Sequence, residues 1–251
     1  MDFAAAYRQE NSAFAELVGD VGAETPVPTC PGWTFKHLLR HVGRGDRWSA
    51  QIVRNRLDHP LDPLSVEGGK PPADAAGAID WLRGGPGLLV DAVQQTGADT
   101  PVWTFLGPRP ASWWVWRRLH EVAVHRADAA IALGRKFTLD ADVAADGITE
   151  WLEWVAIQSG LDGAEPPLNA GTTIHLHATD AGLNEPGEWT VGVDGEGVTW
   201  SHEHGKGTAA IRGGATELLL VLTRRALVSD TGVEVCGEDS VWQQWLDRTP
   251  F

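Results

Sequence analysis

Two ionisable residues four positions apart in one strongly helical stretch are the first candidates for chemistry. Glu121 and His125 lie in WWVWRRLHEVAVHRAD, residues 113–128. On an α-helix this spacing places both side chains on one face, one turn apart. The same face continues with Arg118 and Asp128, so a row expected to point into a helical bundle carries ionisable groups. A bundle that buries such a row usually has a use for it.

A second helical stretch supplies the matching ligand type. PGWTFKHLLRHVGRGDRW, residues 31–48, carries His37 and His41 on a face away from its leucines. One of these histidines, together with Glu121 and His125, would form a metal site of two histidines and one carboxylate. Such a site keeps a coordination position open for water or a substrate.

One superficially similar motif is excluded by its spacing. His120 and Glu121 begin a pattern close to the H-E-x-x-H motif of metalloproteases, but the second histidine, His125, stands one residue too far along the chain. Five residues correspond to about 140° around a helix axis, so the two histidines cannot face the same ion. The protease interpretation is therefore rejected.

Two further histidine pairs are rival metal sites. His175 and His177, like His202 and His204, alternate along predicted strands, so each pair lies on one side of its strand. The ordinary interpretation is the polar face of a half-buried sheet.

An arginine pair closes an apolar helix. Arg224 and Arg225 end the run LLLVLTRR, where basic residues stabilise a helix C-terminus. The functional alternative is that they clamp the carboxylate of a substrate.

The elements that must position these residues fall into two groups. The first group is the set of helical segments before about residue 160, which predicts an up-and-down helical bundle. From about residue 160 the pattern alternates as strands do, with a hairpin through Asp194 and Gly195, and two helices follow. We therefore predict a two-domain α plus α/β protein, with a helical bundle over 1–159 and a small α+β domain over 160–251. The expected bundle helices cover residues 2–20, 34–57, 73–95 with a break at 84–87, 111–133 and 140–157.

Composition excludes several classes of protein. The net charge of −14, from 34 acidic and 20 basic residues, argues against nucleic acid or an anionic membrane surface as the main partner. No apolar run reaches the ~20 residues that span a bilayer, and the first residues lack a signal peptide's pattern, so we expect a cytoplasmic protein. Cys30 and Cys236 form no C-x-x-C pair, and we expect two free thiols. Nucleotide-binding glycine motifs and a serine-hydrolase elbow are also absent.

Three segments together resemble a known family. VPTCPGWTFKHLLRHVGRGDRW, WRRLHEVAVHRADAAIALG and TIHLHATD with EWTVGVDGEGV are similar to the mycothiol-dependent maleylpyruvate isomerase family. The resemblance implies a DinB-like bundle followed by a sterol-carrier-like α+β domain. It also implies that His41, Glu121 and His125 hold a divalent metal, usually zinc. His37 stands where family members often carry Asp, and Asp46 is also atypical.

The resemblance implies an enzyme that activates the thiol of mycothiol. A thiol at the open position of such a site loses its proton near neutral pH and can then add to a small electrophilic substrate. Addition alone is S-transfer, whereas addition followed by elimination isomerises a double bond. Two alternatives stay open. One is a hydrolase or lyase that uses metal-bound water, and the other is a non-catalytic binding protein in which the metal only stabilises the helical bundle. Mycothiol and a small electrophile are the expected partners of a monomer or homodimer, with Arg224 and Arg225 as candidate substrate-holding residues.

Overall fold

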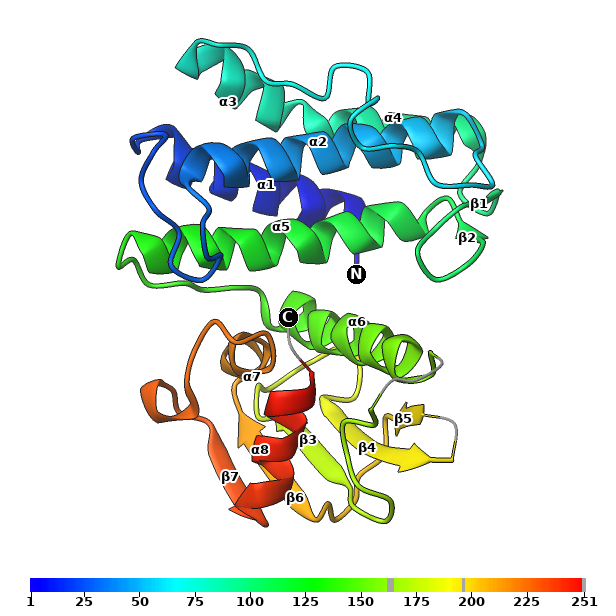
Figure 1. Cartoon of the computed structure of the whole chain (residues 1–251), viewed down its shortest axis with the longest axis vertical. Coiled ribbons are helices and arrows are strands. Elements are labelled where there is room, and N and C mark those ends of the chain that lie inside the picture. The colour runs from blue at the N-terminus through cyan, green and yellow to red at the C-terminus, as the bar shows by residue number, and fades with distance from the viewer. Residues whose placement is uncertain (162–164, 196, 250–251) are drawn as a thin grey trace. The chain divides into compact units, whose positions relative to one another are not determined.

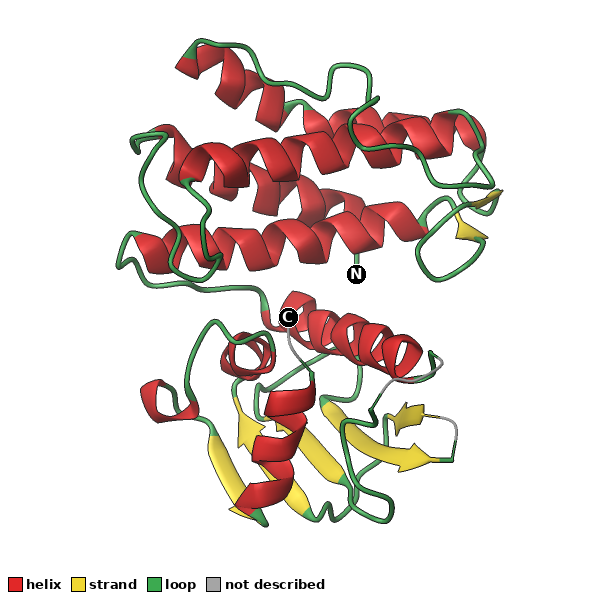
Figure 2. Ribbon diagram, viewed as in Figure 1, coloured by secondary structure: helices red, strands yellow, loops and turns green. Residues whose placement is uncertain are grey.

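The chain forms two compact units. The computed structural model describes residues 1–161, 165–195 and 197–249, and it divides into Met1–Phe137 and Thr138–Phe251. The first unit is built mainly of helices, and the second contains a mixed sheet with helices (Figure 1 and Figure 2). The predicted two-domain α plus α/β class is confirmed. Among the described residues, no helix has the length and apolar character needed to cross a membrane.

The first unit packs α1 against α5 and α2 against α4. Side-chain caps begin two of its helices: a carboxylate oxygen of Asp2 accepts from the Ala5 amide at 3.0 Å, and one of Asp74 accepts from Gly77 at 2.7 Å. The predicted break in the third helix is confirmed at Gly84. The elements are α1 (Phe3–Gly19), α2 (Phe35–Arg54), α3 (Ala75–Arg83), α4 (Gly85–Thr96), β1 (Pro101–Val102), β2 (Arg109–Pro110) and α5 (Trp113–Ala132).

Neighbouring helices of the first unit do not all run in opposite directions. Asp46 of α2 lies against Gly85, where an added Cβ would meet the Asp46 Cβ at 2.9 Å. Further along both helices, the Thr96 hydroxyl donates to the Val53 carbonyl at 3.2 Å. Helices α2 and α4 are therefore parallel neighbours, and the long loop 55–74 returns the chain to the end of the bundle where α2 began (Figure 1). Bundles with one long crossover connection are a known variant.

The second unit contains a five-stranded sheet with the order β5-β4-β3-β6-β7. β3 and β6 pair in parallel, the other neighbouring strands of this sheet pair in antiparallel fashion, and β4 and β5 form the predicted hairpin. Ile174 and Leu176 of β3, with Trp189 and Val191 of β4, are buried in the core that also contains residues of α6, α7 and α8. The elements are α6 (Ala141–Ser159), β3 (Ile174–Ala178), β4 (Glu188–Asp194), β5 (Gly197–Ser201), β6 (Ala209–Gly213), α7 (Ala215–Leu222), the 3₁₀ turn η1 (Val228–Asp230), β7 (Glu234–Gly237) and α8 (Asp239–Arg248).

The boundary between the units differs from the predicted one. We expected it between residues 159 and 160, but the chain divides between Phe137 and Thr138. The reason is that α6 contributes Ile148 and Leu152, both fully buried, to the core of the sheet. Helical periodicity predicts that a helix exists and not which core its apolar face covers.

This division predicts how fragments of the chain behave. A fragment from Thr138 to the C-terminus is expected to unfold cooperatively, whereas one from Gly160 exposes the sheet face that α6 covers and should unfold at a much lower temperature or not fold. The comparison is a thermal melt of both fragments followed by circular dichroism. Equal melting temperatures would contradict the assignment of α6 to the sheet.

Candidate metal centre

The start of α2 is fixed by a reciprocal cap. The Thr34 hydroxyl and the His37 ring nitrogen Nδ1 lie 3.0 Å apart, and the Thr34 amide donates to the same nitrogen at 3.2 Å. This arrangement resembles a capping box, with an imidazole in the place usually taken by a Glu or Gln side chain. His37 therefore holds the helix end, and His41 follows one turn later.

A buried ion pair ties α2 to α5. Asp46 is fully buried, and its carboxylate accepts from the Arg118 guanidinium at 2.9–3.0 Å. Arg118 also donates to the Val42 carbonyl at 2.9 Å. Both contacts lie within one or two turns of the predicted metal ligands, so the pair fixes how the two helices face each other.

The three predicted ligands converge. His41 Nε2 lies 2.6 Å from Glu121 Oε1, and His125 Nε2 lies 3.5 Å from the same oxygen. The donor atoms of all three residues lie within 4.8 Å of one another. Two imidazole nitrogens and a carboxylate oxygen are a donor set that zinc and other divalent transition metals accept. The residues therefore fit the cation that the sequence predicts.

The charges around this group favour an ionised carboxylate. Burial raises the pKa of Glu121, but Arg117, His125, His41 and Arg118 outweigh it and hold that pKa well below its usual range. Burial lowers the pKa of His41 more than its contact with Glu121 raises it. His41 therefore offers a neutral nitrogen to a cation.

The other histidine is protonated in the metal-free protein. Burial alone would lower the pKa of His125, but hydrogen bonds with Asp128, Cys30 and Glu121 raise it to about 10. The folded state therefore binds this proton more tightly than the unfolded chain, whose histidines titrate near ~6.5. The resulting stabilisation is fully present below pH ~6.5 and is lost as the pH rises through about 10.

A pH series tests this linkage. In the presence of a metal chelator, the free energy of unfolding of the wild type is expected to fall by a few kcal/mol between pH ~6.5 and ~9.5. Urea denaturation at each pH measures this free energy. His125→Asn removes the titrating group, so its stability should change much less over this range. A parallel decline in both proteins would show that other groups dominate.

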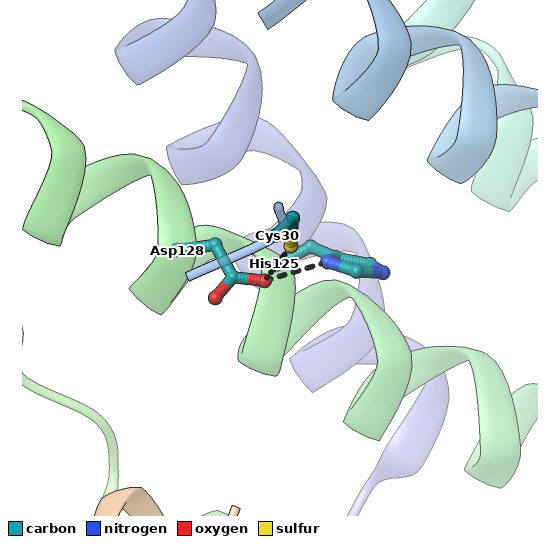
Figure 3. A group of neighbouring side chains, drawn as sticks. All are labelled: Cys30, His125 and Asp128. Carbon is teal, nitrogen blue, oxygen red and sulfur yellow. Dashed lines mark hydrogen bonds and ion pairs between the residues drawn. The ribbon is translucent and has the colours of Figure 1, made fainter. Parts of the chain in front are cut away.

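A carboxylate and a thiol lie behind His125. Figure 3 shows His125, Asp128 and Cys30, with the second ring nitrogen of His125 pointing away from Asp128. The His125 Nδ1–H donates to Asp128 Oδ2 at 2.8 Å, and the Cys30 thiol lies 3.3 Å from the same oxygen. Asp128 is fully buried. A carboxylate on one ring nitrogen orients the imidazole and directs the other nitrogen towards a metal.

This contact makes Asp128 a positioning residue. Asp128→Ala is expected to weaken zinc binding by roughly 10- to 100-fold, because His125 loses the acceptor that sets its orientation. Cys30→Ser is the control, since a hydroxyl can still donate to Asp128, and its affinity should stay close to that of the wild type. Competition with a chromophoric chelator measures both. An unchanged zinc affinity in Asp128→Ala would show that Asp128 does not position His125 for metal binding.

Aromatic rings surround the ligands. The Trp33 ring lies 5.0 Å from that of His41 and 6.1 Å from that of His125, measured between centroids. A pocket of about 440 Å³ opens beside His41 and Glu121. Trp114, 1% exposed, lines the pocket and also packs against Trp48 and Phe105. Trp114 is therefore both a core residue and part of the pocket wall.

Besides Arg118, which pairs with Asp46, three arginines line the same pocket, in a chain with a net charge of −14. Arg40 and Arg44 come from α2, and Arg117 comes from α5, where it pairs with Glu121. Basic groups at a cavity attract anionic ligands. Sequence reasoning missed the role of these arginines and the contact of Cys30 with Asp128. For the group of Cys30, His125 and Asp128, the signal in the sequence was the three-residue spacing of His125 and Asp128, which places both on one helix face.

Comparison with protein families decides the classification. The model of the mycothiol maleylpyruvate isomerase N-terminal domain matches residues 4–130, and the model of the MDMPI C-terminal domain matches residues 142–244. The chain belongs to the mycothiol maleylpyruvate isomerase family. The gap between the two matches contains the boundary at Phe137 and Thr138.

Solved structures agree with this family fold. The crystal structure of a mycothiol-dependent maleylpyruvate isomerase gives a TM-score of 0.59 at 18% identity, covering 94% of this chain and 93% of that one. A structure of such an isomerase with a histidine-to-alanine substitution gives 0.61 at 17% identity, with the same coverage. No curated protein sequence matches the chain. At these identities the likeness establishes the fold alone.

The arginines predicted as a substrate clamp lie in the second unit of this family member. Arg224 follows α7 and donates to the backbone carbonyls of Leu246 and Thr249, at 2.6 and 2.8 Å. Arg225 donates to the Thr223 carbonyl at 2.7 Å. The Arg224 contacts hold the end of α7 to the end of α8, whereas the Arg225 contact with Thr223 is local. A role of either arginine in substrate binding stays a prediction.

Proposed function

We propose that this chain is a divalent-metal-dependent enzyme that activates mycothiol for addition to a small electrophilic substrate. The convergence of His41, Glu121 and His125 at a pocket carries the proposal, and membership of the mycothiol maleylpyruvate isomerase family supports it. Zinc is the cation that we propose, because two imidazoles and one carboxylate suit it and leave a coordination position open.

The chain's own residues have distinct parts in this proposal. His41 and Glu121 face the pocket, and Asp128 holds the proton on His125 Nδ1 so that Nε2 is directed at the site. When bound, a divalent cation lowers the pKa of a thiol that coordinates it, which supplies thiolate near neutral pH. The Trp33 ring packs against both histidines and forms part of the pocket wall.

The substrate that we propose is a small anionic electrophile. Arg40, Arg44 and Arg117 line the pocket, and guanidinium groups bind carboxylates in a bidentate manner. The thiol proton is lost when the thiol is activated. Addition of the thiol sulfur to one carbon of a polarised carbon–carbon double bond then forms the carbon–sulfur bond and breaks the π bond, and in the S-transfer product the neighbouring carbon takes up a proton. Release of the adduct is S-transfer, which we favour, whereas elimination of the thiol after rotation about the carbon–carbon bond is isomerisation.

The first experiment is zinc content by elemental mass spectrometry, followed by titration with mycothiol. We expect about one zinc at this site, lost in His41→Ala and His125→Ala, and mycothiol binding that disappears with it. His59→Ala is the matched control, because His59 is an exposed histidine that also contacts a carboxylate, that of Asp58. Zinc binding without thiol binding would favour the water-using or non-catalytic alternatives, and zinc unaffected by both substitutions would reject the site.

A further inference from the structure

A second group of histidines lies on the sheet of the other unit. His175 and His177 stand on the face of β3 opposite to the core residues Ile174 and Leu176. Glu188, the first residue of β4, is the cross-strand partner of His177 in the register. Residues that oppose each other in an antiparallel pair present their side chains on the same face. One carboxylate and two imidazoles thus share this face.

The connection from β5 to β6 adds a third imidazole. Because the sheet order is β5-β4-β3-β6, this connection must pass β4 and β3 to reach β6. The Thr190 hydroxyl of β4 donates to the Glu203 carbonyl at 2.9 Å. At Gly207 an added Cβ would meet the His175 amide nitrogen at 2.6 Å, so the segment lies tightly against β3. His204 is carried over the same face.

The distances define one cluster around Glu188. Its Oε2 lies 2.9 Å from His175 Nε2 and 2.6 Å from His204 Nδ1, and its Oε1 lies 3.9 Å from His177 Nε2. Donor atoms of His175, Glu188 and His204 all lie within 4.8 Å of one another. The His175 side chain is 7% exposed and that of His204 is 83% exposed. The group therefore has a buried base and a side open to solvent.

We propose that His175, Glu188 and His204 form a second divalent-metal site, with His177 as a further donor. Imidazole nitrogens with one carboxylate select zinc and neighbouring late first-row cations over magnesium or calcium. The site belongs to a different unit from the first site and does not depend on the function proposed above. A cation here joins β3, β4 and the 202–208 segment, so it acts as a clamp on the connection between β5 and β6.

Zinc stoichiometry in the full-length chain tests the proposal. Glu188→Gln keeps the shape of the side chain but removes its charge and one acceptor oxygen, and His204→Ala alters an exposed residue, so neither should unfold the protein. Each is expected to hold one zinc fewer than the wild type, whereas His59→Ala is expected to keep the full complement. His41→Ala should lose only the zinc of the first site. Stoichiometry unchanged from the wild type in both Glu188→Gln and His204→Ala would overturn the second site.

Hydrogen–deuterium exchange supplies a readout that does not rely on counting metal. Added zinc is expected to slow amide exchange in residues 201–208 at least fivefold, in the wild type and in His41→Ala alike. Glu188→Gln should show no such protection. Exchange in this segment that does not respond to zinc in the wild type would show that the cluster is a hydrogen-bonded polar face and not a metal clamp.

Discussion

Replacement of Glu121 and His125 together by alanine is expected to remove the metal from the helical unit and with it all activation of mycothiol. A free thiol with a pKa near 8.5 is only about 3% ionised at pH 7. Bound mycothiol should therefore be alkylated by a small electrophile roughly tenfold faster than free mycothiol, because the lower pKa of the thiol also reduces its intrinsic nucleophilicity. The double variant should lose this advantage.

Turnover of the natural substrate is expected to fall further, by about 10³-fold, because a catalytic metal contributes several kcal/mol. Stopped-flow alkylation at pH 7 measures the first effect without knowledge of the substrate. The control is again His59→Ala, with circular dichroism to confirm that the variants fold. Retained acceleration in the double variant would count against the proposed function and would leave the second-site proposal untouched.

Loss of the buried ion pair is expected to give the largest change in stability. Asp46→Ala leaves Arg118, only 5% exposed, without its nearer carboxylate, since Glu121 Oε1 lies 3.7 Å from the guanidinium. Breaking one side of a buried pair costs about 3–5 kcal/mol. Urea denaturation should show this loss in the free energy of unfolding.

Two further variants separate burial of the charge from loss of the side chain. The double variant Asp46→Leu, Arg118→Met replaces both charges with apolar groups and is expected to recover most of the stability. Glu24→Ala breaks the pair with Lys36, in which the Glu24 side chain is 75% exposed and that of Lys36 is 62% exposed. This change should cost less than ~1 kcal/mol. Equal effects of Asp46→Ala and Glu24→Ala would show that Arg118 finds other compensation.

The proposed ligand group could be anticipated because one pair follows a local rule and the third residue follows from the family resemblance. Helical spacing places Glu121 and His125 on one face, and the family motifs select His41 over His37. The structure explains that choice, since His37 caps α2 and His41 reaches Glu121. The contact of His41 with Glu121 spans 80 residues, so helical spacing alone could not have predicted it.

Two of the features that sequence reasoning missed, the Cys30 contact and the centre of the sheet cluster, are long-range. Cys30 lies 98 residues from Asp128, and no periodic pattern links two such positions. The sheet cluster was anticipated only as two separate pairs, because its centre is Glu188, which follows from the register of β3 and β4. The placement of α6 was wrong for the same reason, since amphipathic periodicity does not identify the partner.

The long loop between α2 and α3 lines the pocket but carries none of the proposed metal ligands, so the pocket mouth and the metal centre can change independently in evolution. Loop 55–74 contributes Pro63 to the pocket wall, and Trp48, another wall residue, donates to the Leu61 carbonyl at 2.7 Å. The loop supplies none of the three ligands. Substitutions or insertions there can reshape the pocket mouth at small energetic cost, because surface loops tolerate them. Evolution can thus alter which molecules enter while the reactive centre is inherited unchanged.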